Sequence, residues 1–231
     1  KLAIDDGIQK LVATPHTLNG VYSLLTDEIN DEVTGLNEIL IRENLNIEII
    51  PGAEIHLCVR MSDQILSGKV PSLNNTGRYV MVEFPFQTIP AGYKDEIFQL
   101  NLHNVIPIIA HPERNLVCQR ELDIFHELVS MGCLIQITAM SVTGELGEEP
   151  MECAHRLLDL RLTHIIASDA HSAESRPPIL SPALEIAAQI MGNRQEAETL
   201  VIDRPEAILA GKPVELPEPR RPRKKWWFLG K

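Results

Sequence analysis

Residues 105–114 read V-I-P-I-I-A-H-P-E-R, an unbroken apolar segment followed at once by a histidine, a glutamate and an arginine. The continuous apolar run over residues 105–110 is typical of a strand that is buried on both faces, as in a parallel sheet. Other short strands are predicted on similar grounds. They cover residues 10–14, 47–50, 79–84, 133–138 and 164–168.

Helical patterns separate these strands along the chain. Residues 26–44 carry apolar side chains at helical spacing behind Thr26, a candidate N-cap. Further helices are predicted over residues 61–66, 93–103, 121–131, 150–160 and 181–191, and residues 1–6 are predicted to end a helix before Gly7. This alternation predicts an α/β fold, a parallel sheet wrapped by helices. Periodicity alone does not distinguish a doubly wound sheet from a barrel.

Side chains that bind metals recur where the predicted strands end. They are His16, Glu54, Glu83, His111, Asp169 and His171. In α/β barrels the carboxyl ends of the strands gather around one mouth, so these side chains would meet at one site. A single histidine or glutamate after a strand is more often a cap or a surface residue. Ligand types at so many strand ends favour a cluster of borderline divalent ions such as Mn²⁺, Zn²⁺ or Fe²⁺.

Two arginines follow the metal-type motifs directly. Arg114 stands three residues after His111, and Arg176 lies in S-R-P-P just past His171. A guanidinium beside a metal cluster suits a phosphoryl group, because its planar fork bonds two oxygens. By position alone, each arginine is equally compatible with a surface role.

The remaining histidines lack a strand-end placement. Structural roles are expected for His103, His126, His155 and His164. His56, two residues beyond Glu54, could reach the mouth, although a place behind the ligands or on the surface is favoured.

Composition excludes several classes of protein. A net charge of -11 argues against nucleic acid as the general partner, because phosphates would be repelled. Cys58, Cys118, Cys133 and Cys153 are scattered, which favours reduced thiols of a cytosolic protein. None of them has an arginine six residues on, so the loop of a cysteine-dependent tyrosine phosphatase is absent.

The motifs A-T-P-H, P-G-A-E-I, V-E-F-P, I-I-A-H-P-E-R, A-S-D-A-H and S-R-P-P together resemble the polymerase and histidinol phosphatase (PHP) superfamily. More closely, they are similar to the bacterial capsular and exopolysaccharide tyrosine-protein phosphatases of the CpsB/YwqE type. The resemblance covers residues 1–211. It implies a distorted seven-stranded barrel that holds up to three metal ions, commonly manganese.

The resemblance also implies roles for the candidate residues. Glu54 would bridge two metals with Asp169, His111 and Glu83 around them, and His16 and His171 would hold a third. Arg114 and Arg176 would grip the phosphate. The implied reaction is hydrolysis of phosphotyrosine on a partner, a bacterial tyrosine kinase that controls polysaccharide chain length or export. The enzyme itself is expected to be cytoplasmic and could be peripheral to the membrane.

One departure from the family pattern concerns the first strand. Family members carry D-x-H-x-H on that strand, and this motif does not occur in the chain. We therefore expect a barrel that lacks its first strand. We expect residues 1–231 alone to bind metal weakly and to hydrolyse poorly. Two alternatives stay open, a small-molecule phosphatase such as histidinol phosphatase and a non-catalytic PHP remnant that acts as a binding module.

Residues 212–231 differ in composition from the rest. They are rich in proline and basic residues and contain both tryptophans, Trp226 and Trp227. We predict a flexible tail. The basic and aromatic end, Arg220 to Lys231, is compatible either with peripheral contact with an anionic membrane or with a weakly interacting terminus.

Overall fold

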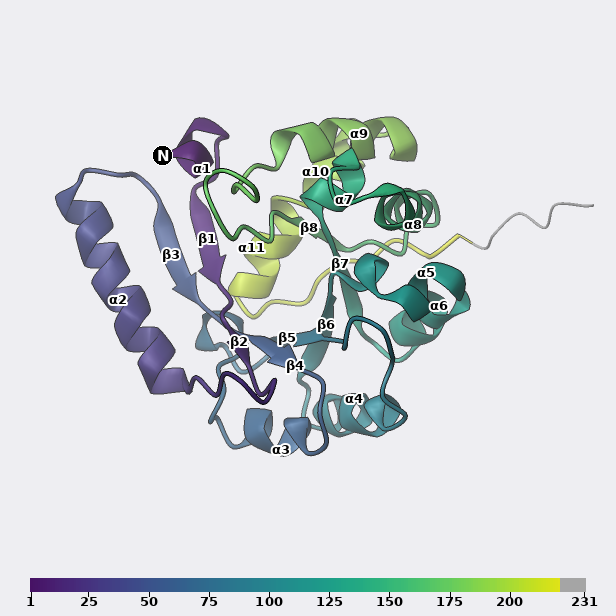
Figure 1. Cartoon of the computed structure of the whole chain (residues 1–231), viewed down its shortest axis with the longest axis horizontal. Helices are drawn as coiled ribbons and strands as arrows, with labels where there is room; N and C mark the ends of the chain where they lie inside the picture. Colours follow the sequence, from purple (N-terminus) through teal and green to yellow (C-terminus); the bar gives the residue numbers. More distant parts are fainter. Residues whose placement is uncertain (221–231) are drawn as a thin grey trace, which may run out of the picture.

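The computed structural model describes residues 1–220, and within them an all-parallel set of strands is surrounded by helices (Figure 1). The strands are β1 Lys10–Ala13, β2 His16–Thr17, β3 Glu48–Pro51, β4 Glu54–His56, β5 Tyr79–Glu83, β6 Ile106–Ala110, β7 Leu134–Thr138 and β8 Ile165–Ala167. The α-helices are α1 Leu2–Asp5, α2 Thr26–Arg42, α3 Met61–Leu66, α4 Tyr93–Leu102, α5 Leu116–Arg120, α6 Asp123–Ser130, α7 Ala139–Thr143, α8 Glu148–Asp159, α9 Ser181–Met191, α10 Arg194–Thr199 and α11 Asp203–Leu209. Short 3₁₀ turns cover Leu73–Asn75 and Pro112–Arg114.

Strand order follows chain order. The larger sheet runs β2-β4-β5-β6-β7-β8, and β1 pairs with β3 beside it. A doubly wound sheet reverses its order at a switch point, and the described strands show no such reversal. The alternating α/β fold with a parallel sheet, predicted from the sequence, is confirmed.

Two breaks lie at the same level of the sheet, one between β1 and β2 and the other between β3 and β4. Ala13 faces Pro51 and His16 faces Glu54, so one register continues through both breaks. Gly52 lies at the break, where an added Cβ would come 2.8 Å from a side-chain carbon of Leu73. The sequence predicted single strands here, because the bend depends on this close approach, which no periodicity reveals.

Helix α2 begins differently from the prediction. Its N-cap is Leu25, and Thr26 already lies inside the helix, where its hydroxyl donates to the carbonyl oxygen of Gly68. The carboxylate of Glu28 accepts from the backbone N–H of Leu25 at 2.8 Å. The Thr26 cap was therefore wrong, since a glutamate three residues on satisfies the first free N–H.

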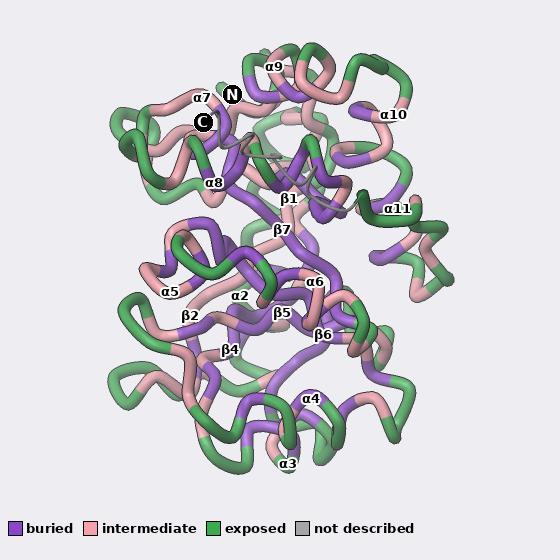
Figure 2. The backbone as a smooth tube through the Cα atoms, turned by 90° about the vertical axis from the view of Figure 1, so that its right-hand side faces the viewer, coloured by how far each residue is buried: buried purple, intermediate pink, exposed green. Residues whose placement is uncertain are grey.

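Alternate residues of each strand point to opposite faces of the sheet. On β5, Val80 and Val82 join the large hydrophobic cluster beneath the surrounding helices. Tyr79 and Met81 join a second, smaller cluster on the other face, here called the inner face. Glu83 follows with the same parity as Tyr79 and Met81, so it points to the inner face. Figure 2 shows the buried strands at the centre and the exposed residues on the outer helices and loops.

Residues near the end of the domain close the inner face at the start of the strands. Ile208 and Leu209 of α11 belong to the inner cluster, and Val214 packs against it. The hydroxyl of Tyr79, the first residue of β5, donates to the carbonyl oxygen of Lys212 at 2.7 Å. The inner face is thus covered at this end, and the candidate site residues lie at the opposite end, where the strands finish.

For the predicted tail, 212–231, the structure describes the part up to Arg220. The backbone N–H of Arg220 donates to the carbonyl oxygen of Leu160 at 2.7 Å, so this part runs along the domain. The remainder of the basic and aromatic segment, predicted to contact a membrane, lies outside the described residues. Among the helices of residues 1–220, none is long and apolar enough to cross a membrane.

The cysteines of the described chain are all free thiols. Cys118, Cys133 and Cys153 are buried, and Cys58 is half-buried. Burial raises the pKa of the Cys133 thiol to about 12, so it stays protonated at neutral pH.

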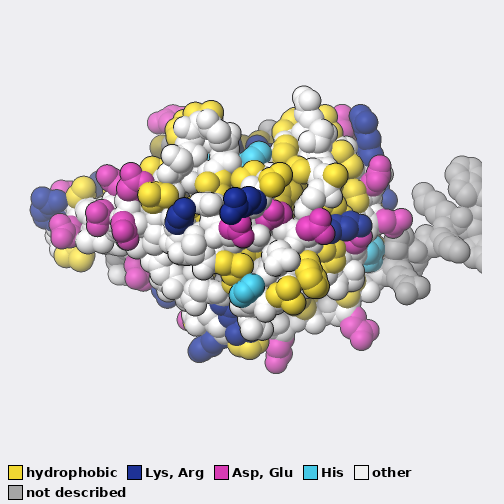
Figure 3. Space-filling view, turned by 90° about the horizontal axis from the view of Figure 1, so that it is seen from below, with side chains coloured by type: hydrophobic (Ala, Val, Ile, Leu, Met, Phe, Trp, Pro, Cys, Tyr) yellow, Lys and Arg dark blue, Asp and Glu magenta, His cyan; other side chains and the backbone are white. Residues whose placement is uncertain are grey.

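The face that includes α3 and α4 exposes hydrophobic side chains among charged ones and histidines (Figure 3). Phe98 and Leu102 of α4 are among the exposed hydrophobic residues.

His164 gives the fold a pH dependence. It is fully buried, and its Nδ1 accepts from the backbone N–H of Ile135 at 2.8 Å. Burial, with a smaller contribution from the charge of Arg204, lowers its pKa from 6.5 to about 3. Between these values the unfolded chain binds a proton that the folded one does not. The free energy of unfolding should therefore fall by about 1.4 kcal/mol per pH unit as the pH drops below 6.5.

The variant His164→Asn isolates this contribution, because asparagine has an oxygen that can replace Nδ1 as acceptor. Urea unfolding at pH 7, 6 and 5 should show a shallower loss of stability in the variant than in the wild type. Parallel curves would show that His164 does not carry the proton linkage.

Candidate metal centre

The candidate ligands converge because of strand alternation and strand endings. On β4, Ile55 joins the large outer cluster, so Glu54 and His56 point to the inner face. His16 lies opposite Glu54 in the ladder of β2 and β4, and His56 lies opposite Glu83 in that of β4 and β5. Three neighbouring strands thus bring their acidic and imidazole groups to one point.

The ligands from β6 and β8 reach that point through an unusual backbone. His111, directly after β6, has φ of 33°, and Asp169, two residues after β8, has φ of 50°. Both angles lie in the left-handed region, which costs roughly 1–3 kcal/mol for a residue other than glycine. Such strain turns a side chain out of the strand direction, and at both positions it serves the site.

Two overlapping groups of side chains could each hold a metal ion. His16, Glu54 and Glu83 form one group, and Glu54, His111 and Asp169 form the other. In each group the ligand atoms lie within 4.8 Å of one another. Glu54 belongs to both groups.

The two best-buried members form a close pair. Nε2 of His111 lies 2.8 Å from Oε1 of Glu54, and both residues are buried. Burial would raise the pKa of Glu54, but the hydrogen bond and charge of His111 outweigh it and hold the pKa below its usual value. Burial would lower the pKa of His111, but Glu54 reverses this and holds it above its usual value. Each group therefore favours the charged form of the other, and a bound cation would compete with a proton on His111.

His16 provides the test of whether a metal fits. Its Nδ1 lies 3.5 Å from Oε1 of Glu54 and 3.5 Å from Oε2 of Glu83. This nitrogen is buried, yet it has no hydrogen-bond partner among the described residues. A buried nitrogen aimed between two carboxylates without a hydrogen bond is suited to coordinate a cation. Nitrogen with carboxylate oxygen is also the donor set of manganese, zinc and iron sites.

Asp169 connects the ligand groups to the arginines. Its Oδ2 accepts from Nη1 of Arg114 at 2.8 Å and also from Nη2 of Arg176. Its Oδ1 accepts no such bond from residues 1–220 and remains available to a cation. One carboxylate thus fixes two guanidinium groups, which come from segments 62 residues apart in the chain, at the rim of the metal groups.

His171 stands apart from the two groups. Its side chain is half-exposed, and its Nδ1 lies 2.9 Å from the carbonyl oxygen of Asp169. Its ring centroid is 6.4 Å from that of His16. The structure thus brings His16, Glu54, Glu83, His111 and Asp169 together, with Arg114 and Arg176 beside them and His171 at the edge.

Three residues at the site received little or no weight from the sequence. Nδ1 of His56 lies 3.5 Å from Oε2 of Glu83, and strand alternation from Glu54 is the signal that could have favoured it. Glu113 is fully buried, where its Oε1 accepts from the backbone N–H of Thr138 and the hydroxyl of Ser141. These bonds fix the turn that carries His111 and Arg114. Asn115 is also buried, and no sequence signal distinguished it.

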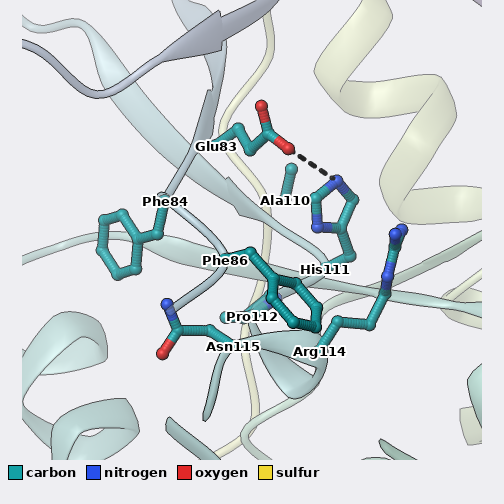
Figure 4. A pocket seen from close by; sticks show the side chains of 8 residues that line it. All are labelled: Glu83, Phe84, Phe86, Ala110, His111, Pro112, Arg114 and Asn115. Atoms are coloured by element: carbon teal, nitrogen blue, oxygen red, sulfur yellow. Dashed lines mark ion pairs between the residues drawn. The ribbon is translucent and has the colours of Figure 1, made fainter. Parts of the chain in front are cut away.

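A pocket opens beside the metal groups (Figure 4). It is lined by Glu83, Phe84, Phe86, Ala110, His111, Pro112, Arg114 and Asn115. Figure 4 shows Phe86 and Arg114 beside one another among the residues that line this pocket, with His111 and Glu83 next to them.

Comparison with known proteins gives one consistent result. A family model described as "Capsular polysaccharide synthesis, CpsB/CapC" matches residues 1–210. The tyrosine-protein phosphatase YwqE of Bacillus subtilis (strain 168) is 31% identical, over 99% of this chain and 90% of that protein. The putative tyrosine-protein phosphatase CapC of Staphylococcus aureus is 35% identical, over 78% of this chain and 70% of that protein.

A solved structure agrees with the sequence comparisons. It comes from crystal structures described as those of YwqE from Bacillus subtilis and CpsB from Streptococcus pneumoniae, "unique metal-dependent tyrosine phosphatases". It matches with a TM-score of 0.90 and 30% sequence identity, over 96% of this chain and 89% of that chain.

Proposed function

The chain belongs to the CpsB/CapC family of capsular polysaccharide synthesis, and from this we propose that its strand-end site is a metal-dependent protein-tyrosine phosphatase. One observation carries the proposal beyond membership. Two ligand groups share Glu54, and Asp169 of the second group also holds two arginines. Cation sites that adjoin paired guanidinium groups are suited to a phosphate dianion.

In this proposal the residues divide into metal ligands and phosphate ligands. His16, Glu54 and Glu83 hold one ion, and Glu54, His111 and Asp169 hold another. His171 stands near His16 for a third ion, and manganese is the proposed metal. When bound, divalent ions activate water as a nucleophile and neutralise charge on the phosphate.

Arg114 and Arg176 bind and orient the phosphate. Each uses one terminal nitrogen on Asp169, which leaves further N–H donors on each guanidinium for phosphate oxygens. The arginines are held before the substrate arrives, so little side-chain freedom is lost on binding.

In this proposal the buried Glu54–His111 pair forms the floor of the site, where the phosphate and the attacking water would bind. Burial excludes bulk water from this floor, which strengthens every charge interaction there. His16 and His56, which are less buried, lie between this floor and solvent.

The finer fold and domain limits are part of the proposal. Residues 1–211 form the phosphatase domain, a distorted barrel of the PHP type, followed by the tail 212–231. Sequential strand order supports a barrel, and β2 and β8 each lack a second neighbour within residues 1–220. The opening between these strands is where the first strand of such a barrel belongs.

The proposed substrate is phosphotyrosine on a bacterial tyrosine kinase that controls polysaccharide synthesis, and the enzyme is proposed to act in the cytoplasm. The printed names of the relatives, tyrosine-protein phosphatases of capsule synthesis, support it. The segment from Arg220 to Lys231 is proposed to bring the enzyme to an anionic membrane surface.

The test compares hydrolysis of a phosphotyrosine peptide with that of histidinol phosphate, with Mn²⁺ added and after chelation. We expect the peptide to be preferred, chelation to abolish hydrolysis and Mn²⁺ to restore it. Each comparison is a ratio within one protein, so it holds even if the absolute rate is low. Preference for histidinol phosphate, or hydrolysis that resists chelation, would contradict the proposal.

A further inference from the structure

Phe86 is an exposed aromatic side chain at the mouth of the candidate site. It follows β5 by three residues, it is 58% exposed, and it lines the same pocket as His111 and Arg114. In Figure 4 its ring stands beside the Arg114 side chain. Single exposed hydrophobic residues are common, so exposure alone does not assign it a role.

The loop that carries Phe86 is tied to the turn that carries Arg114. Asn115 is buried, and its Nδ2 donates to the carbonyl oxygens of Pro85 at 2.7 Å and Thr88 at 3.0 Å. The next backbone N–H, that of Leu116, donates to the carbonyl oxygen of Phe86 at 3.2 Å. The backbone of the aromatic residue is therefore held in a fixed relation to that of the arginine.

The opposite ends of Asn115 explain why this connection is firm. Its Oδ1 accepts from the backbone N–H groups of Val117 and Cys118, which caps helix α5. All the polar atoms of this buried side chain are thus in use. These bonds hold the backbone of the loop, and with it the position from which the Phe86 ring extends.

Side chains around the mouth also differ between its two halves. The loops after β2, β4 and β5 expose apolar side chains, those of Val21, Tyr22, Val59 and Phe86. The segments after β6 and β8 carry Arg114 and Arg176. β2, β4 and β5 are neighbours in the sheet, so these apolar side chains come from one half of the strand order and the arginines from the other.

We propose that Phe86 is a specificity-determining residue that packs against the aryl ring of a phosphomonoester whose phosphate is held by Arg114. This inference rests on the proposed function and deepens it. Offset or edge-on packing of two rings favours an aryl ester. Phosphoserine has no ring to pack against Phe86.

The experiment measures kcat and KM for two peptides of one sequence, with phosphotyrosine or phosphoserine at the same position, in the presence of Mn²⁺. The variants are Phe86→Ala, Phe86→Leu and Phe86→Tyr. Phe98→Ala is the matched control, because Phe98 is 57% exposed and lies on α4 outside the site. Inhibition by inorganic phosphate is measured for each protein.

We expect Phe86→Ala to lower kcat/KM for the phosphotyrosine peptide about tenfold, mainly through KM. Phe86→Leu should fall between, and Phe86→Tyr should keep the wild-type value because it keeps the ring. Phosphoserine hydrolysis, phosphate inhibition and the Phe98→Ala control should be unchanged. This pattern separates ring packing from a general disturbance of the site.

Two results overturn the inference, and they differ. If the wild type prefers phosphotyrosine and Phe86→Ala keeps that preference, Phe86 is not the determinant, and the proposed function stands. If the wild type hydrolyses neither peptide, or prefers phosphoserine, the proposed function fails and the inference fails with it.

Discussion

Glu54→Gln should lower kcat/KM for a phosphotyrosine peptide by about a thousandfold or more, the largest single effect expected at this site. Glu54 is the one residue common to both ligand groups, so its loss weakens both ions together. Glutamine keeps the shape of the side chain but removes the charge that a bridging ligand needs. The measurement is steady-state hydrolysis over a range of Mn²⁺ concentrations.

The control for this variant is Glu185→Gln. Glu185 is exposed and paired with Arg194 on the outer helices, so its replacement removes one negative charge far from the site. Circular dichroism checks that both variants fold. A Glu54→Gln enzyme that regains wild-type activity at saturating Mn²⁺ would contradict the bridging role, because both ions would then work without the shared carboxylate.

Arg114→Lys and Arg176→Lys are each expected to lower kcat/KM about a hundredfold, with little change in Mn²⁺ affinity. Lysine keeps the positive charge but loses the planar fork that bonds both Asp169 and phosphate. Inhibition by inorganic phosphate should weaken in parallel. Kinetics and metal titration of the same preparations give both quantities.

The double variant adds information, because both arginines bond the same oxygen of Asp169. We expect its loss to be smaller than the product of the single losses. Arg120→Lys, an exposed position on the neighbouring helix α5, serves as the control. Single variants that lose metal affinity as strongly as activity would assign the arginines to holding Asp169, rather than to phosphate.

Much of the fold could be predicted from the sequence, because the core strands are short apolar runs bounded by helical patterns. Parallel strands place their carboxyl ends on one side, and this rule alone predicts that Glu54, Glu83 and His111 meet at one site. The sequence could not distinguish a doubly wound sheet from a barrel, because that difference depends on which strands become neighbours. Strand order in the structure excludes the doubly wound alternative for the described residues.

The details that escaped prediction depend on contacts distant in sequence. The breaks between β1 and β2 and between β3 and β4 are one example. At the second break Gly52 lies so close to Leu73 that a larger residue would not fit. The left-handed turns at His111 and Asp169 were not predicted, since histidine and aspartate tolerate positive φ but mostly adopt negative φ. Glu113 belongs to a recognisable motif, yet its carboxylate is buried against the start of α7. Arg114 and Arg176 both donate to Asp169, whereas their sequence positions alone were equally compatible with a surface role.

The central claim is that two cation sites share the carboxylate of Glu54. Diffraction from crystals soaked in Mn²⁺, recorded at the manganese absorption edge, tests it most directly. We predict two anomalous peaks with the Glu54 carboxylate between them, one beside His16 and Glu83 and the other beside His111 and Asp169. A single peak away from Glu54, or no peak among these side chains, would contradict the claim.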